Sequence, residues 1–236
     1  MARRVRRRFD WQALLLLLAV YVCVVLLWET QWIYPLKLVV VLLHEISHAI
    51  AAVATGGRVI EIQVLQGEAG HCVTQGGNGP LIYSAGYLGS LAFGVVLLLL
   101  ATRVRAEQPA SALLGLLMLG VAVVLIPWEA NRFGKTFGVL TGALLVALAV
   151  LPAVWSATAV RVVAVTSCLY AIVDVKSDVL DRPGVDSDAV RLAAVTDISA
   201  TTWGVLWIGI SLAVTSAAFW LAVTARPMKG VDSRGP

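Results

Sequence analysis

The chain has 236 residues, of which 59% are hydrophobic and 14% charged, and its mean hydropathy is +0.87. Soluble domains average about 45–50% apolar and about 25% charged residues, so this composition excludes an ordinary soluble protein and indicates an integral membrane protein. The net charge of +4 does not indicate a nucleic-acid partner, because the basic residues gather at the ends of apolar runs, as in ARRVRRRF at residues 2–9.

Apolar runs of about 17–25 residues can span a bilayer as helices. Following the chain, we predict such helices at 11–28, 35–55, 80–101, 110–127, 136–155, 159–179 and 203–223. The polar segment 180–202 precedes the last run, and in it Ser187 or Asp186 can cap a short amphipathic helix. The predicted fold class is therefore an all-α membrane protein, a polytopic bundle of about six to seven transmembrane helices.

One short segment follows a different pattern. Residues 56–77, GGRVIEIQVLQGEAGHCVTQGG, alternate apolar and polar side chains around the turn-forming QGEAG, which predicts a small β-hairpin directly after the second helix. The arginine-rich N-terminus predicts a cytoplasmic start. Segments 56–79, 128–135 and 180–202, with the hairpin, then lie on the cytoplasmic side, and Arg103, Arg105 and the basic tail 226–234 on the other. The expected location is the plasma (inner) membrane.

The second predicted helix contains LLHEISHAI at 42–50, and with it two of the three histidines. His44 and His48 are four residues apart and share one helix face, as two zinc ligands require, and Glu45 is adjacent. His-Glu-x-x-His is the metalloprotease pattern, in which the glutamate activates a zinc-bound water. Ionisable groups inside a bilayer are costly. We therefore favour a metal site over polar packing within the bundle.

A catalytic zinc site needs a third protein ligand. Asp174 and Asp178 in the sixth predicted helix are also four residues apart. If that helix starts near Val160, Asp174 lies about 21 Å along it, closer to the depth of the histidines than Asp178 at about 27 Å. Asp174 is thus the expected third ligand, with Asp178 as the alternative. His71 has no spacing relation to this group and is expected to be an exposed residue of the hairpin turn.

Several motifs together resemble the site-2 protease family of intramembrane zinc metalloproteases, and most closely its short peptidase-like branch. They are HEISHA in a membrane helix, a following β-hairpin, SAGYLGS opening the next helix, and the late segments DVKSDVL at 174–180 and DSDAVRLA at 186–193. The resemblance implies zinc held by His44, His48 and Asp174, Glu45 as the base, and membrane-spanning substrates. The N-x-x-P-x-x-D-G segment of better-characterised members is missing here.

The predicted function is that of an intramembrane zinc metalloprotease that hydrolyses peptide bonds of membrane protein substrates within the lipid bilayer. The predicted organisation is a single integral membrane domain, 1–236, with a metalloprotease-like core at 35–180, a cytoplasmic loop with a short helix at 180–202 and a last transmembrane helix at 203–223. One alternative is a zinc-binding membrane scaffold or regulator without proteolysis. The other is a transporter, which the short chain without an inverted repeat disfavours. The oligomeric state is left open.

Overall fold

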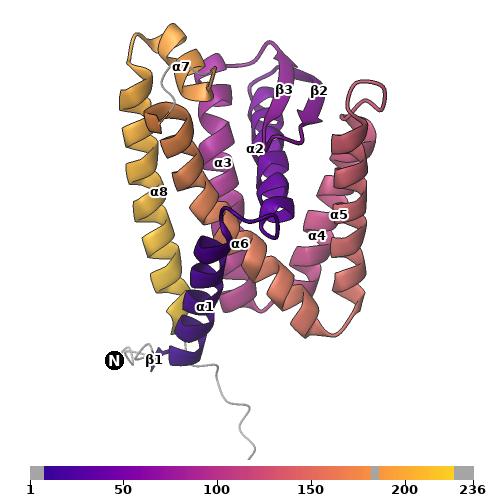
Figure 1. Cartoon of the computed structure of the whole chain (residues 1–236), viewed down its shortest axis with the longest axis vertical. Helices are drawn as coiled ribbons and strands as arrows, with labels where there is room; N and C mark the ends of the chain where they lie inside the picture. Colours follow the sequence, from indigo (N-terminus) through magenta and orange to yellow (C-terminus); the bar gives the residue numbers. More distant parts are fainter. Residues whose placement is uncertain (1–7, 182–185, 226–236) are drawn as a thin grey trace, which may run out of the picture.

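The computed structural model describes residues 8–181 and 186–225 and confirms the predicted fold class (Figure 1). Eight α-helices cover most of the described chain. Their bounds are α1 Trp11–Leu27, α2 Tyr34–Ala54, α3 Gly79–Leu99, α4 Glu107–Val124, α5 Arg132–Val150, α6 Ala153–Val175, α7 Asp188–Thr196 and α8 Ala200–Val223. Single π-helical turns extend α3 over Leu100–Val104 and α6 over Lys176–Asp181. The strands are β1 Arg8–Phe9, β2 Arg58–Val64, β3 Gly70–Gln75 and β4 Thr224–Ala225.

Among the described residues, six helices are long and apolar enough to cross a membrane: α2, α3, α4, α5, α6 and α8. The helix α1 has 17 residues and is shorter. The chain is thus an integral membrane protein with the expected number of spans.

Most helices begin a few residues before the positions predicted from hydropathy. For some of them the reason is that a polar cap precedes the apolar run. The Asn131 side chain accepts a hydrogen bond from the Gly134 amide at the start of α5, and Ser199 accepts one from Thr202 at the start of α8. Pro152 separates α5 from α6, which starts at Ala153 and not near Val160.

The helix α2 lies at the centre of the bundle. Of the membrane-span window of this helix, 72% is buried inside the protein, against 22% for α5 and for α8. It packs against α3, α6 and the β2–β3 hairpin. A helix shielded in this way can carry ionisable side chains within a membrane bundle, because they face protein and not lipid.

The predicted hairpin is present as the antiparallel pair β2–β3, with Ile62 opposite Cys72. Its turn returns along α2, where the Tyr34 hydroxyl donates a hydrogen bond of 2.8 Å to the Gln66 carbonyl. Lys37 Nζ lies 3.1 Å from Glu68 Oε2. These contacts fix the turn against the first part of α2, so the hairpin forms part of the bundle and one wall of the site described below.

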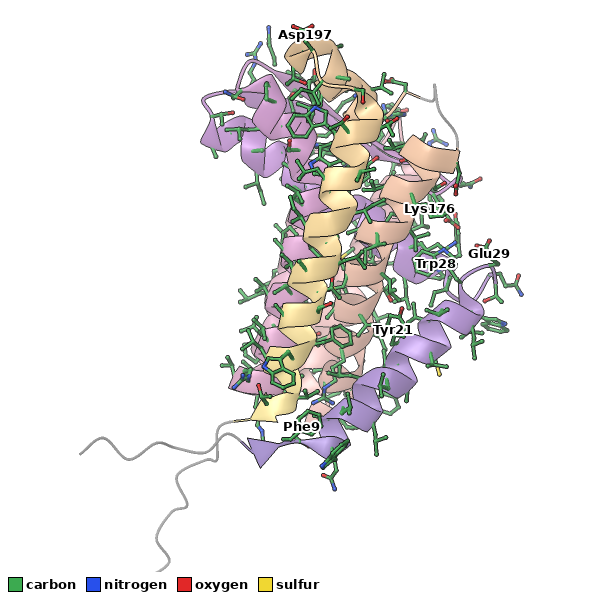
Figure 2. All side chains as sticks on the ribbon, turned by 90° about the vertical axis from the view of Figure 1, so that its left-hand side faces the viewer. Phe9, Tyr21, Trp28, Glu29, Lys176 and Asp197 are labelled. Carbon is green, nitrogen blue, oxygen red and sulfur yellow. The ribbon has the colours of Figure 1, made fainter. Side chains whose placement is uncertain are left out.

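The relative positions of the chain ends correct the predicted topology. β1 pairs with β4, and the Asp10 amide donates to the Val223 carbonyl at 2.7 Å, so the start of α1 lies beside the end of α8. Figures 1 and 2 show α1 rising from this end only part of the way, and Figure 1 shows α2 continuing to the opposite end, where the hairpin and α7 lie. α1 and α2 thus run in the same direction along the bundle, one after the other.

The structure thus differs from the predicted topology in one respect: the start of α1 and the hairpin lie at opposite ends of the bundle and not at the same end. Hydropathy indicates how long an apolar helix is but not in which direction it runs. For this reason the topology predicted from the sequence differs from that of the structure. Other basic residues of the predicted topology lie outside the described residues: the four arginines within residues 3–7, Arg182, and those of the tail 226–234.

Candidate metal centre

The two histidines of α2 point to the same place, as their spacing predicts. The ring centroids of His44 and His48 are 4.7 Å apart. His48 Nδ1 lies 2.7 Å from the carbonyl oxygen of Ile82 in α3. A carbonyl can only accept, so Nδ1 carries a proton and donates, and Nε2 faces the site. This is how metal-binding histidines are usually oriented.

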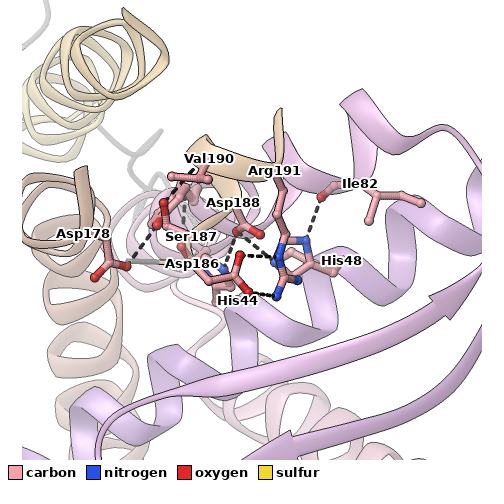
Figure 3. A network of polar contacts seen from close by, with 12 residues as sticks. His44, His48, Ile82, Asp178, Asp186, Ser187, Asp188, Val190 and Arg191 are labelled. Carbon is pink, nitrogen blue, oxygen red and sulfur yellow. Dashed lines mark hydrogen bonds and ion pairs between the residues drawn. The ribbon is translucent and has the colours of Figure 1, made fainter. Parts of the chain in front are cut away.

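The third member of the group is Asp188, the first residue of α7 (Figure 3). Its Oδ2 lies 3.0 Å from His44 Nε2 and 3.1 Å from His48 Nε2. Ser187 caps α7 by accepting from the Val190 amide, and Leu192 is fully buried beneath the helix. The cap and the buried leucine together hold the Asp188 carboxylate over the two imidazoles.

Glu45 is buried beside this group and faces the hairpin. A Cβ atom built on Gly70, the first residue of β3, would lie 2.5 Å from Glu45 Oε1. In the same way, a Cβ atom on Gly86 of α3 would lie 2.6 Å from His48 Nε2. The site therefore depends on two glycines that leave room for the imidazoles and the carboxylate.

The expected third ligand and its alternative are placed differently from the prediction. Asp174 and Asp178 line the same cavity, but the group whose ligand atoms all lie within 4.8 Å of one another is His44, His48 and Asp188. Asp174 lies deeper along α6 than predicted, about 32 Å from its start, because α6 begins at Ala153 and not near Val160.

The two aspartates still belong to the surroundings of the site. The Tyr87 hydroxyl donates to Asp178 Oδ2 at 3.1 Å. His71 is exposed, as expected, but it lies in β3 and not in the turn, and its side chain lines the cavity.

No pattern in the sequence assigns Asp188 to the metal site, although it lies in the segment DSDAVRLA beside the capping residue Ser187. Asp188 comes 144 residues after His44, and no spacing rule connects a loop helix to a membrane helix at that distance. The available signal was a carboxylate at the first position of a predicted amphipathic helix close to a transmembrane segment.

These residues enclose a cavity of about 530 Å³ between α2, α3, α6, α7 and β3. Burial alone raises the pKa of the Asp188 carboxyl, but the imidazoles of His48 and His44 outweigh burial and hold that pKa below its ordinary value. Burial, with Glu45 and Asp188 nearby, raises the pKa of Cys72 to about 12. Cys72 is thus a neutral thiol, and the available ligand atoms are imidazole nitrogens and a carboxylate oxygen.

The donor set fits zinc. Tetrahedral zinc sites use bonds of about 2.0–2.2 Å to nitrogen and oxygen, which place neighbouring ligand atoms about 3.3 Å apart. The distances of 3.0 and 3.1 Å from Asp188 Oδ2 to the two Nε2 atoms are close to that spacing. Three protein ligands facing a cavity would leave the fourth position open, as catalytic zinc sites require.

Comparison with known proteins agrees with this geometry. The family model described as Peptidase M50B-like matches residues 17–218, most of the chain. No curated protein and no solved structure matches. The match covers both histidines, Glu45 and Asp188, and it confirms the resemblance to the site-2 protease family. The chain belongs to the Peptidase M50B-like family.

Proposed function

We propose that the protein is a zinc-dependent intramembrane endopeptidase that hydrolyses peptide bonds of membrane-spanning substrates. The observation that carries the proposal is the meeting of His44, His48 and Asp188 beside the buried Glu45, in the wall of a cavity large enough for an extended peptide. In a membrane protein such a group of ionisable side chains is costly unless it serves a function. The family supports the same class of activity.

In this proposal His44, His48 and Asp188 hold zinc, and Asp188 replaces Asp174 as the third ligand. Zinc supplies a Lewis acid that lowers the pKa of a bound water to about 7 and polarises the substrate carbonyl. The Ile82 carbonyl fixes the ring of His48 through Nδ1 and keeps its Nε2 directed at the ion.

Glu45 acts as general base and then as general acid. Its carboxylate takes one proton from the attacking water while the water oxygen bonds to the carbonyl carbon. It then gives that proton to the amide nitrogen as the C–N bond breaks, which yields one new carboxyl end and one new amine end. The contact between Glu45 and Gly70 supports this role, because it holds the carboxylate between the hairpin and the two histidines.

The hairpin offers an edge for an extended substrate. A transmembrane substrate must unwind before cleavage, because its carbonyls are held in helical hydrogen bonds. The outer side of β2 is already engaged: the Ile62 amide donates to the Leu125 carbonyl, and Asn131 donates to the Val64 carbonyl. Residues 70–74 of β3 line the cavity. We propose that the unwound segment adds to β3 as a further strand.

The test uses purified protein in detergent, loaded with zinc, and a panel of model transmembrane substrates. Wild type should bind one zinc and cleave, and Glu45→Gln should keep the metal but lose at least about 100-fold in kcat. A wild type that binds no zinc would refute the proposal. If Glu45→Gln cleaves as fast as wild type, Glu45 is not the general base. If wild type binds zinc but cleaves none of the substrates, the scaffold alternative is favoured.

A further inference from the structure

The charge of the cavity is unbalanced. Six carboxyl groups line it, those of Glu45, Glu68, Asp174, Asp178, Asp186 and Asp188. Among the described residues that line it, Arg191 is the only lysine or arginine. An anion that forms in the cavity during a reaction can therefore be stabilised by only one permanently positive side chain of its lining, that of Arg191.

Arg191 is carried by the same helix as the proposed zinc ligand. It follows Asp188 by three residues in α7, so both lie on one face of the helix, and both side chains line the cavity. The buried Leu192 anchors this helix in the protein. The position of the guanidinium relative to the histidines is therefore set by the same packing that sets the position of Asp188.

The guanidinium has a resting partner that it can exchange. Its Nε donates to Asp186 Oδ1 at 3.0 Å, and its Nη2 donates to Asp186 Oδ2 at 2.7 Å (Figure 3). The Arg191 and Asp186 side chains are 43% and 68% exposed. Exposed ion pairs contribute about 0–1 kcal/mol, so the pair is easily rearranged. Of the five N–H donors of the guanidinium, these two bonds use two.

Resting on the proposed function, we infer that Arg191 binds the substrate carbonyl oxygen and stabilises the negative charge that develops on it. As the water oxygen bonds to the carbonyl carbon, the π electron pair of the C=O bond moves to the carbonyl oxygen. It returns to re-form the C=O bond when the C–N bond breaks and the nitrogen takes the proton from Glu45. A cation beside that oxygen lowers the barrier, because the charge exists only near the transition state.

Two tyrosine hydroxyls in the cavity already donate to other groups. The Tyr87 hydroxyl donates to Asp178, and the Tyr170 hydroxyl lies 3.4 Å from the Glu68 carbonyl. His71 lines the cavity from the exposed side of β3 and could offer an N–H group. It is therefore the natural comparison residue.

The experiment compares four variants of the zinc-loaded protein in detergent on a transmembrane substrate that wild type cleaves. Arg191→Gln should lose about 10²- to 10³-fold in kcat with unchanged zinc content, as expected for removal of one transition-state donor. Arg191→Lys should recover part of that loss. Asp186→Asn breaks the same ion pair but keeps the guanidinium, so it should lose less than about tenfold, and so should His71→Gln.

Equal losses in Arg191→Gln and Asp186→Asn would overturn the inference, because they would show that only the ion pair matters. So would a loss of zinc in Arg191→Gln, which would indicate that Arg191 merely positions Asp188. A large loss in His71→Gln without one in Arg191→Gln would assign the role to His71.

A second readout does not need turnover. A peptide phosphonamidate carries a tetrahedral anion in place of the reacting amide and imitates the charged transition state. Arg191→Gln should weaken its binding by about the factor lost in kcat/KM and leave binding of the matching uncharged peptide unchanged. Equal phosphonamidate affinities in wild type and Arg191→Gln would refute the role of Arg191 alone, whereas a wild type that cleaves nothing would refute the proposed function itself.

Discussion

Gly86 provides the most direct test of the metal centre. A Cβ atom at this position would lie 2.6 Å from His48 Nε2 and 2.5 Å from His44 Cε1. Carbon and its non-bonded neighbours keep about 3.5 Å or more, and His44 Nε2 would lie closer still, so in Gly86→Ala the rings or α3 must retreat by more than about 1 Å. Zinc–ligand distances tolerate only about 0.2 Å. We expect zinc affinity to fall at least about 100-fold, which equals about 2.8 kcal/mol.

Zinc affinity is measured by competition with a chelating dye, next to the thermal unfolding of the metal-free protein. Gly120→Ala in α4 is the matched control, because nothing lies within 4 Å of a Cβ atom built there. It should bind zinc like wild type. If Gly86→Ala also binds zinc with wild-type affinity, the imidazoles do not occupy the positions described here and the proposed ligand set is wrong.

Three further predictions follow from the same structure. In a chelator titration, Asp188→Asn should lower zinc affinity at least about 100-fold, whereas Asp174→Asn should change it by less than about threefold. The reverse order would make Asp174 the third ligand. Gly142→Leu should destabilise the protein by about 1–3 kcal/mol or more, because even a Cβ atom built there lies 2.7 Å from the Gly115 carbonyl oxygen, where α4 contacts α5. Unchanged thermal unfolding of this variant would contradict the packing. Tags at the two chain ends should react with an impermeant reagent from the same side of the membrane, whereas labelling from opposite sides would contradict the β1–β4 pairing.

The position of the chain ends also changes the expected orientation of the site. The Arg103 guanidinium donates to Thr224 Oγ1 at 3.5 Å, so Arg103 lies at the end of the bundle where the chain begins and where α8 ends. By the positive-inside rule we expect this end to face the cytoplasm, and the metal centre to open toward the other side.

Much of the protein follows from local sequence. Helix spans, the hairpin and the shared face of His44 and His48 all depend on periodicity within a few residues, and short-range geometry fixes periodicity. For this reason the membrane class and the His-Glu-x-x-His group could be predicted without a structure. Helix ends were less accurate, because caps such as Asn131 lie outside the apolar runs.

The tertiary structure decided the features that join distant parts of the chain. It selected Asp188 over Asp174, because packing of α7 and the starting point of α6 determine which carboxylate reaches the imidazoles. It also placed the start of α1 beside the end of α8, which no hydropathy pattern records. The sequence by itself determined two histidines, a glutamate and a membrane helix to carry them. Only the folded chain determined which carboxylate meets the two histidines and which arginine lies beside it, because contacts between residues so far apart depend on how whole helices pack.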